Sequence, residues 1–306
     1  MNINMNTKKT PSSGIIKKQR LLGAAFAAPA ALLVLFATII PVAWNIVLSF
    51  SNWSIIGENS FAGLTHYMEV FANKAALKTV WQSITISLVA SVTAMILGTC
   101  LAIMIYRVSR LEGAFFRFLF YGPGMLPMTV VGLLFTFVLA TDEGLVNNFL
   151  KLVGLANLTS PWLAEKGTVL IVIGLVQGWR SSGTIMMLIY TAILGIPESL
   201  RESAHLDGAS FITQVRRIIL PLIRSTIQMA FSFMVMWAFK TYDIVWSMTG
   251  GGPGDLSKTT PILIVEQAFK FNKFGYASAL SLVYAALIIF VIIIIRKGLG
   301  GETYEY

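Results

Sequence analysis

Long apolar stretches alternate with short polar segments along the whole chain. A helix needs about 20 apolar residues to cross the hydrocarbon core of a bilayer. By this criterion the sequence predicts six membrane spans, at Leu22–Phe50, Val80–Ile105, Phe115–Ala140, Thr168–Leu194, Leu222–Trp246 and Ala277–Ile295. The first is too long, and starts too late, for a cleaved signal peptide, so we interpret it as retained. The pattern predicts an all-α integral membrane fold with six transmembrane helices.

The composition supports a membrane location. Of the 306 residues, 56% are hydrophobic and only 12% are charged. Soluble domains usually contain about 25% charged residues and about 45–50% apolar residues. The chain therefore lacks the ionic surface of a soluble protein, and we expect a multi-pass membrane protein.

The net charge of +9 is compatible with nucleic acid or with an anionic lipid surface as a partner. The basic residues lie beside the predicted spans, which favours membrane lipid, and we expect no nucleic-acid partner. They are concentrated on one side, at Lys8, Lys9, Lys17, Lys18, Arg20, Arg107, Arg110, Arg117, Arg201, Arg216, Arg217, Arg224, Arg296 and Lys297. The opposite side has only Lys74, Lys78, Lys151, Lys166, Lys258, Lys270 and Lys273. The positive-inside rule therefore places both termini in the cytoplasm.

Residues 1–20 are polar and basic and show no helical period. We expect them to form a flexible cytoplasmic tail whose lysines contact anionic headgroups. Residues 21–306 then form the membrane domain.

Few residues are suited to catalysis or metal binding. Cys100 is the single cysteine, and His66 and His205 are the only histidines. These numbers exclude a disulfide framework within one chain and argue against a metal centre. The nearest approach to a phosphate-binding loop, at residues 254–259, lacks the adjacent Gly-Lys pair. We therefore expect no cofactor and no enzymatic activity in this chain.

The loop between the fourth and fifth predicted spans has the pattern of two short helices. Ser199 and Glu202 have capping-box spacing, which predicts the start of the first helix. Gly208 is suited to ending that helix in a left-handed conformation. Ser210 is suited to capping a second helix, with Phe211, Val215 and Ile218 on one face.

Two general interpretations of this loop deserve comparison. An amphipathic elbow resting on the lipid headgroups is the ordinary one. A DNA-binding helix-turn-helix is disfavoured, because the loop is tethered to the bilayer at both ends and has little access to a major groove.

Particular residues favour a third interpretation. The segments Glu202-Ser203-Ala204, Asp207-Gly208-Ala209 and Leu220-Pro221, with Ile218, resemble the cytoplasmic "EAA" loop of binding-protein-dependent ABC importer permeases. Ser203 departs from that pattern by replacing an alanine with another small residue. A second likeness, to the carbohydrate-import, maltose-type branch, is found in Tyr242-Asp243, Met248–Pro253 and Phe274–Ala279.

This resemblance implies that residues 21–306 form an ABC transporter type I transmembrane domain in a bacterial or archaeal cell membrane, with a coupling helix in the cytoplasmic loop. The coupling residues would be Glu202, Ser203, Ala204, Asp207, Gly208 and Ala209. The implied partners are a second permease subunit, two cytoplasmic ATPase subunits that bind ATP and magnesium, an extracellular solute-binding protein and a saccharide substrate. The Glu202 carboxylate is suited to pairing with a basic residue in a cleft of the ATPase subunit.

A polar stripe within the fourth span is a candidate lining for the substrate pathway. Gln177, Arg180, Ser181 and Thr184 recur with helical spacing on one face. An arginine at the bilayer centre costs about 2.5–3.5 kcal/mol on insertion scales, so Arg180 should face water, substrate or an acid such as Asp243. Trp237 and Thr241 in the fifth span are further candidates for contact with a sugar, although an aromatic residue there is also suited to ordinary packing.

Lys240 and Asp243 are three residues apart in the fifth predicted span and are expected to pair in a gating or structural role. The glycine-rich segment 250–254 is either an external contact for the binding protein or an ordinary connector. An ion-coupled secondary transporter remains the alternative function, with Asp243 as the acid nearest to a predicted span.

Overall fold

The structure, a computed structural model, describes the backbone of residues 13–53 and 59–299. Within these ranges every regular element is a helix, and the only β-type pairing there is an isolated bridge between Ser51 and Phe61. The predicted all-α class is confirmed.

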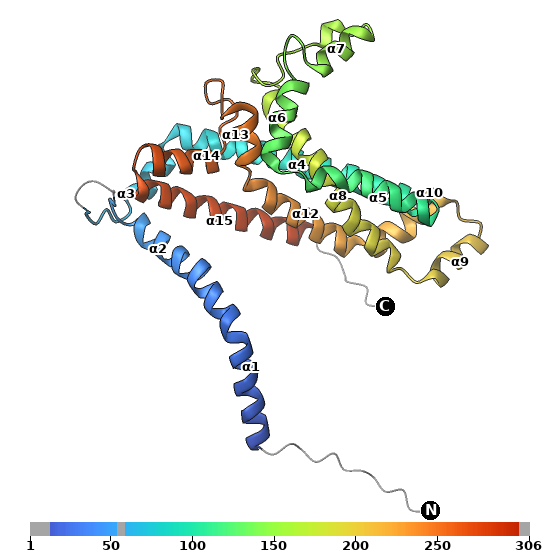
Figure 1. Ribbon diagram of the computed structural model, residues 1–306, viewed down its shortest axis with the longest axis horizontal. Helices are drawn as coiled ribbons and strands as arrows, with labels where there is room; N and C mark the ends of the chain where they lie inside the picture. Colours follow the sequence, from blue (N-terminus) through green and yellow to red (C-terminus); the bar gives the residue numbers. More distant parts are fainter. Residues whose placement is uncertain (1–12, 54–58, 300–306) are drawn as a thin grey trace, which may run out of the picture.

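An N-terminal arm of helix projects from the body of the molecule (Figure 1). It consists of α1 (Ser13–Val34), a π-helical turn (Leu35–Ile39) and α2 (Ile40–Ser49). Residues 13–20 of the predicted tail are helical and form the start of α1; lysine, glutamine and arginine are good helix formers. Residues 1–12 lie outside the described part.

The remaining helices form the body, in which α4, α8, α12 and α15 are long and lie roughly alongside one another (Figure 1). The bounds of the body helices are α3 (Thr65–Ala72), α4 (Lys74–Tyr106), α5 (Arg110–Met125), α6 (Met128–Val138), α7 (Leu145–Leu152), α8 (Val169–Leu194), α9 (Glu198–Leu206), α10 (Phe211–Gln214), α11 (Leu220–Leu222), α12 (Arg224–Phe239), α13 (Asp243–Thr249), α14 (Thr260–Val265) and α15 (Phe274–Leu299).

Four of the predicted spans are helices long and apolar enough to cross a membrane, at Leu21–Ser49, Lys74–Tyr106, Val169–Leu194 and Phe274–Gly298. The other two are bent helix pairs. α5 and α6 meet at 94°, and the α10–α11 segment meets α12 at 69°. The six predicted spans agree with the structure when each bent pair is taken as one span, although Phe115–Ala140 and Leu222–Trp246 are not single straight helices.

The elbow between α5 and α6 is caused by Pro127. Leu126 is extended, with φ −70° and ψ 141°. A residue before proline is pushed toward this extended region, and proline has no N–H to continue the helical hydrogen bonds. The carbonyl groups before the elbow therefore need donors from elsewhere.

The most extensive helix packing in the body is that of α4 against α8, and it depends on glycine. A β-carbon at Gly174 would lie 2.7 Å from the Val89 β-carbon, and one at Gly178 would lie 2.6 Å from the Thr93 β-carbon. These glycines let the two backbones approach closely, as small residues commonly do between membrane helices.

Gly178→Ala should destabilise the protein, because its new methyl group has no space between α4 and α8. Overpacking of this kind costs about 1–3 kcal/mol. Thermal unfolding in detergent should show a lower midpoint. The matched control is Gly122→Ala, where a β-carbon meets no heavy atom within 4 Å. Equal midpoints for the two variants would contradict the close approach.

Candidate functional site

A cavity of about 410 Å³ lies between α5, α8 and α12. Four residues predicted for the substrate pathway line it: Arg180, Ser181, Thr184 and Trp237. Trp237 is 52% exposed, and its ring centroid lies 5.9 Å from that of Phe233, which also lines the cavity. The cavity thus combines aromatic faces with hydroxyl and guanidinium groups, a mixture suited to binding a polar organic molecule.

Arg180 is held by backbone carbonyl groups. Its Nε donates to the Leu126 carbonyl oxygen at 3.0 Å, and its Nη2 donates to the carbonyl oxygens of Leu126 at 2.7 Å and Gly124 at 3.1 Å. Arg180 and Asp243 both lie in the described part of the chain, and no ion pair joins them. Of the alternatives open for Arg180, the ion pair with Asp243 does not form, and carbonyls freed at the α5–α6 elbow supply the acceptors instead.

Gln177 and Thr241 lie apart from this cavity lining and hydrogen-bond to each other, with the Gln177 side-chain amide donating to the Thr241 hydroxyl. Both side chains are buried. The Thr259 hydroxyl in turn donates to the Thr241 carbonyl at 3.1 Å. The pair therefore fastens the break between α12 and α13 to α8.

The predicted helical pairing of Lys240 with Asp243 was wrong. Lys240 caps the end of α12, whereas Asp243 is the first residue of α13, and the chain between them is not helical. No salt bridge joins these two described residues. The interrupted helix removes the spacing on which that prediction depended.

A second cavity, of about 610 Å³, lies between α12 and the C-terminal end of α15. It is lined in part by Ser225, Gln228, Ser232, Phe233 and Arg296. Phe233 lines both cavities. Sequence reasoning missed this polar face, although its serine and glutamine positions have a helical spacing that could have identified it.

The α9 helix is exposed at the end of the molecule beyond α8, from which a short linker separates it (Figure 1). The predicted capping box was wrong: Pro197 is the N-cap, so the helix begins at Glu198 and Ser199 lies inside it. Gly208 has φ +73°, as predicted. Hydrogen bonds from Gly208 to His205 and from Ala209 to Ala204 complete a Schellman-type end.

The predicted coupling residues occupy different environments on α9. Glu202, Ser203 and Asp207 are exposed, whereas Ala204 faces inward. A shallow cavity of about 460 Å³ beside the helix is lined by Glu198, Arg201, Glu202, His205 and Leu206. Leu206 is 87% exposed, so the surface offers apolar as well as charged contacts.

Aromatic and charged contacts attach this loop to the end of α4. The Arg201 guanidinium lies 5.3 Å from the Tyr106 ring centroid and pairs with Glu198 at 3.3 Å. The Arg107 guanidinium lies 4.5 Å from the Phe211 ring centroid. The Ser210 hydroxyl accepts from the Thr213 amide, which confirms the predicted second cap. These contacts hold the loop against the end of α4.

Comparison with known proteins identifies the class. Residues 94–297 match the family described as binding-protein-dependent transport system inner membrane component. The chain belongs to this family, and the resemblance to ABC importer permeases is confirmed. It is thus a membrane subunit of a transport system and not the ATPase.

Individual relatives cover most of the chain. It is 33% identical to the probable ABC transporter permease protein YurN of Bacillus subtilis (strain 168), over 88% of this chain and 92% of the relative. It is 31% identical to the sulfoquinovosyl glycerol transport system permease protein SmoG of Agrobacterium fabrum (strain C58 / ATCC 33970), over 88% and 87%.

The fold is also similar to a chain in the crystal structure of a bacterial ABC transporter involved in the import of the acidic polysaccharide alginate. The TM-score is 0.79 at 20% identity, covering 94% of this chain and 97% of that one. This likeness supports the fold.

Arg180→Met should destabilise the α5–α6 elbow, because it leaves carbonyl groups without their donors. The loss should be about 1–3 kcal/mol, measured as the free energy of unfolding in mixed micelles. Thr184→Val replaces another polar side chain of the same cavity with an apolar one of the same shape, and it should lower the free energy of unfolding less. Equal losses would show that the Arg180 hydrogen bonds do not support the elbow.

Proposed function

We propose that this chain is the permease subunit of an ATP-driven importer and forms part of the pathway for a saccharide delivered by an extracellular solute-binding protein. The observation that carries the proposal is the connection of the cavity to α9. Arg180, Ser181 and Thr184 lie on α8, and only a short linker separates the end of α8 from α9. A displacement of α9 is therefore transmitted directly to the cavity wall.

In this proposal α9 is the coupling helix and docks on a cytoplasmic ATPase subunit. Its exposed Glu202 carboxylate pairs with a basic residue there, and its exposed Leu206 supplies apolar contact. The excess of basic residues on this side supports a cytoplasmic location for α9 and for both termini. ATP and magnesium are bound by the ATPase subunits, and a second permease subunit completes the pathway.

The saccharide assignment is supported by the aromatic and hydrogen-bonding lining of the cavity and by the name of the SmoG relative. The Trp237 and Phe233 rings are suited to stacking on the C–H face of a sugar, while Ser181, Thr184 and Arg180 are suited to its oxygen atoms. An ion-coupled carrier is disfavoured by membership of a binding-protein-dependent family.

The proposal predicts that uptake of a saccharide requires ATP and the binding protein. Proteoliposomes containing both permease subunits and the ATPase should take up radiolabelled saccharide when ATP is present on the ATPase side. Ionophores that collapse ion gradients should leave this uptake unchanged. Uptake driven by an ion gradient without ATP would instead support the secondary transporter.

Glu202→Ala should weaken the coupling of ATP hydrolysis to transport, because an anionic contact with the ATPase is lost. We expect saccharide uptake per ATP hydrolysed to fall about tenfold, the effect of losing about 1.4 kcal/mol of interaction. The matched control is Glu143→Ala, which removes an exposed carboxylate in the loop between α6 and α7. An uptake-to-hydrolysis ratio equal to that of the control would remove Glu202 from the coupling contact.

A further inference from the structure

The loop between α13 and α14 has a defined conformation. Gly250, Gly251 and Gly254 have φ values of 61°, 88° and 56°, and Asp255 has 59°. Such values favour glycine, so the repeated glycines allow a sequence of tight turns. The segment Pro253–Asp255 forms an exposed tip, whereas Ser257 is fully buried beneath it.

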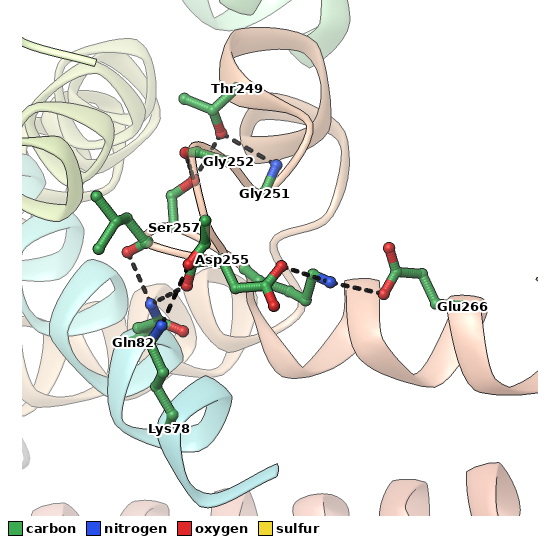
Figure 2. A network of polar contacts seen from close by, with 11 residues as sticks. Lys78, Gln82, Thr249, Gly251, Gly252, Asp255, Ser257 and Glu266 are labelled. Carbon is green, nitrogen blue, oxygen red and sulfur yellow. Dashed lines mark hydrogen bonds and ion pairs between the residues drawn. The ribbon is translucent and has the colours of Figure 1, made fainter. Parts of the chain in front are cut away.

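Side-chain hydrogen bonds brace the loop from within (Figure 2). The Thr249 and Ser257 hydroxyls are 2.7 Å apart, and the Ser257 hydroxyl donates to the Gly252 carbonyl at 2.9 Å. The Gly251 amide donates to the Thr249 hydroxyl at 3.2 Å. Both ends of the loop are thereby joined across its base.

One external anchor comes from α4. The Gln82 side-chain amide donates to the carbonyl oxygens of Asp255 and Leu256, each at 2.7 Å (Figure 2). Gln82 is only 3% exposed. Two hydrogen bonds from one buried amide fix the position of the tip relative to α4.

The second anchor is Lys258, which joins the loop to the end of α14. Its Nζ lies 2.7 Å from an Asp255 carboxylate oxygen and 2.9 Å from a Glu266 carboxylate oxygen. The side chains of Lys258 and Glu266 are each 16% exposed. Burial lowers the pKa of Lys258, but hydrogen bonds and charge from both acids outweigh this and raise it above its ordinary value. The lysine therefore remains charged between them.

We propose that Gln82 and Lys258 are positioning residues that hold the Pro253–Asp255 tip in the conformation recognised by the saccharide-loaded binding protein. The inference rests on the proposed function, in which this loop is external. A preorganised surface binds its partner with less loss of conformational entropy. The loop is also connected to the break between α12 and α13, because the hydroxyl of Thr259, next to Lys258, donates to the carbonyl of Thr241, the partner of Gln177.

The test measures ATPase rate against the concentration of saccharide-loaded binding protein in the complete complex in nanodiscs. Lys258→Met should raise the half-saturating concentration about tenfold, equivalent to a docking-competent fraction of about one tenth, while the maximal rate changes less than twofold. Gln82→Leu should have the same effect through the other anchor. Lys258→Arg should restore most of the affinity, because arginine also pairs with two carboxylates.

Lys273→Met is the matched control, because Lys273 is exposed and has no ion pair among the described residues. Hydrogen exchange supplies an independent reading: amides of residues 250–258 should exchange faster in Lys258→Met and Gln82→Leu than in the control. Unchanged exchange, or a lower maximal rate with an unchanged half-saturating concentration, would overturn the positioning role. A wild-type complex that no binding protein stimulates would instead overturn the proposed function.

Discussion

The close packing of α4 against α8 is the constraint on which the other features depend. Gly174 and Gly178 allow this approach, because larger side chains there would meet α4 directly. From α8 come the cavity residues and, through a short linker, α9. From α4 come Gln82, which holds the external loop, and Tyr106, which contacts Arg201 of α9. One helix pair therefore connects both ends of the molecule.

The breaks between α5 and α6 and between α12 and α13 explain how a membrane protein can accommodate polar groups within its spans. Breaking a helix frees carbonyl groups that lipid cannot satisfy, so a protein donor must be supplied. At Pro127 this donor is Arg180, whose guanidinium both fastens the elbow and lines the cavity. At the α12–α13 break the Gln177 amide donates to the Thr241 hydroxyl, and the Thr241 carbonyl accepts from the Thr259 hydroxyl. In each case a polar residue of α8 contacts an irregular segment of the chain, and Arg180 does so at the cavity.

Much of this architecture was predictable from local sequence, and the rest depends on contacts between distant segments. Hydropathy located all six apolar regions, and Gly208 and Ser210 marked a helix end and a helix start. Pro197 overrode the capping pattern of Ser199, because its backbone geometry suits the N-cap. The partners of Arg180 and Gln82 are backbone carbonyls far away in sequence, which no residue pattern reveals. The carbonyl acceptors also explain why Arg180 needs no acidic partner such as Asp243.

The central claim is that α9 connects an external ATPase to the cavity through α8. Photo-crosslinking from a probe at exposed Ser203, in membranes containing the complete transporter, tests it most directly. The account predicts a crosslink to the ATPase subunit whose yield changes between nucleotide-free and ATP-bound states. The account would be contradicted if a complex that transports saccharide gave no crosslink from Ser203 to the ATPase subunit, while a probe placed elsewhere on the same side of the protein did crosslink to it.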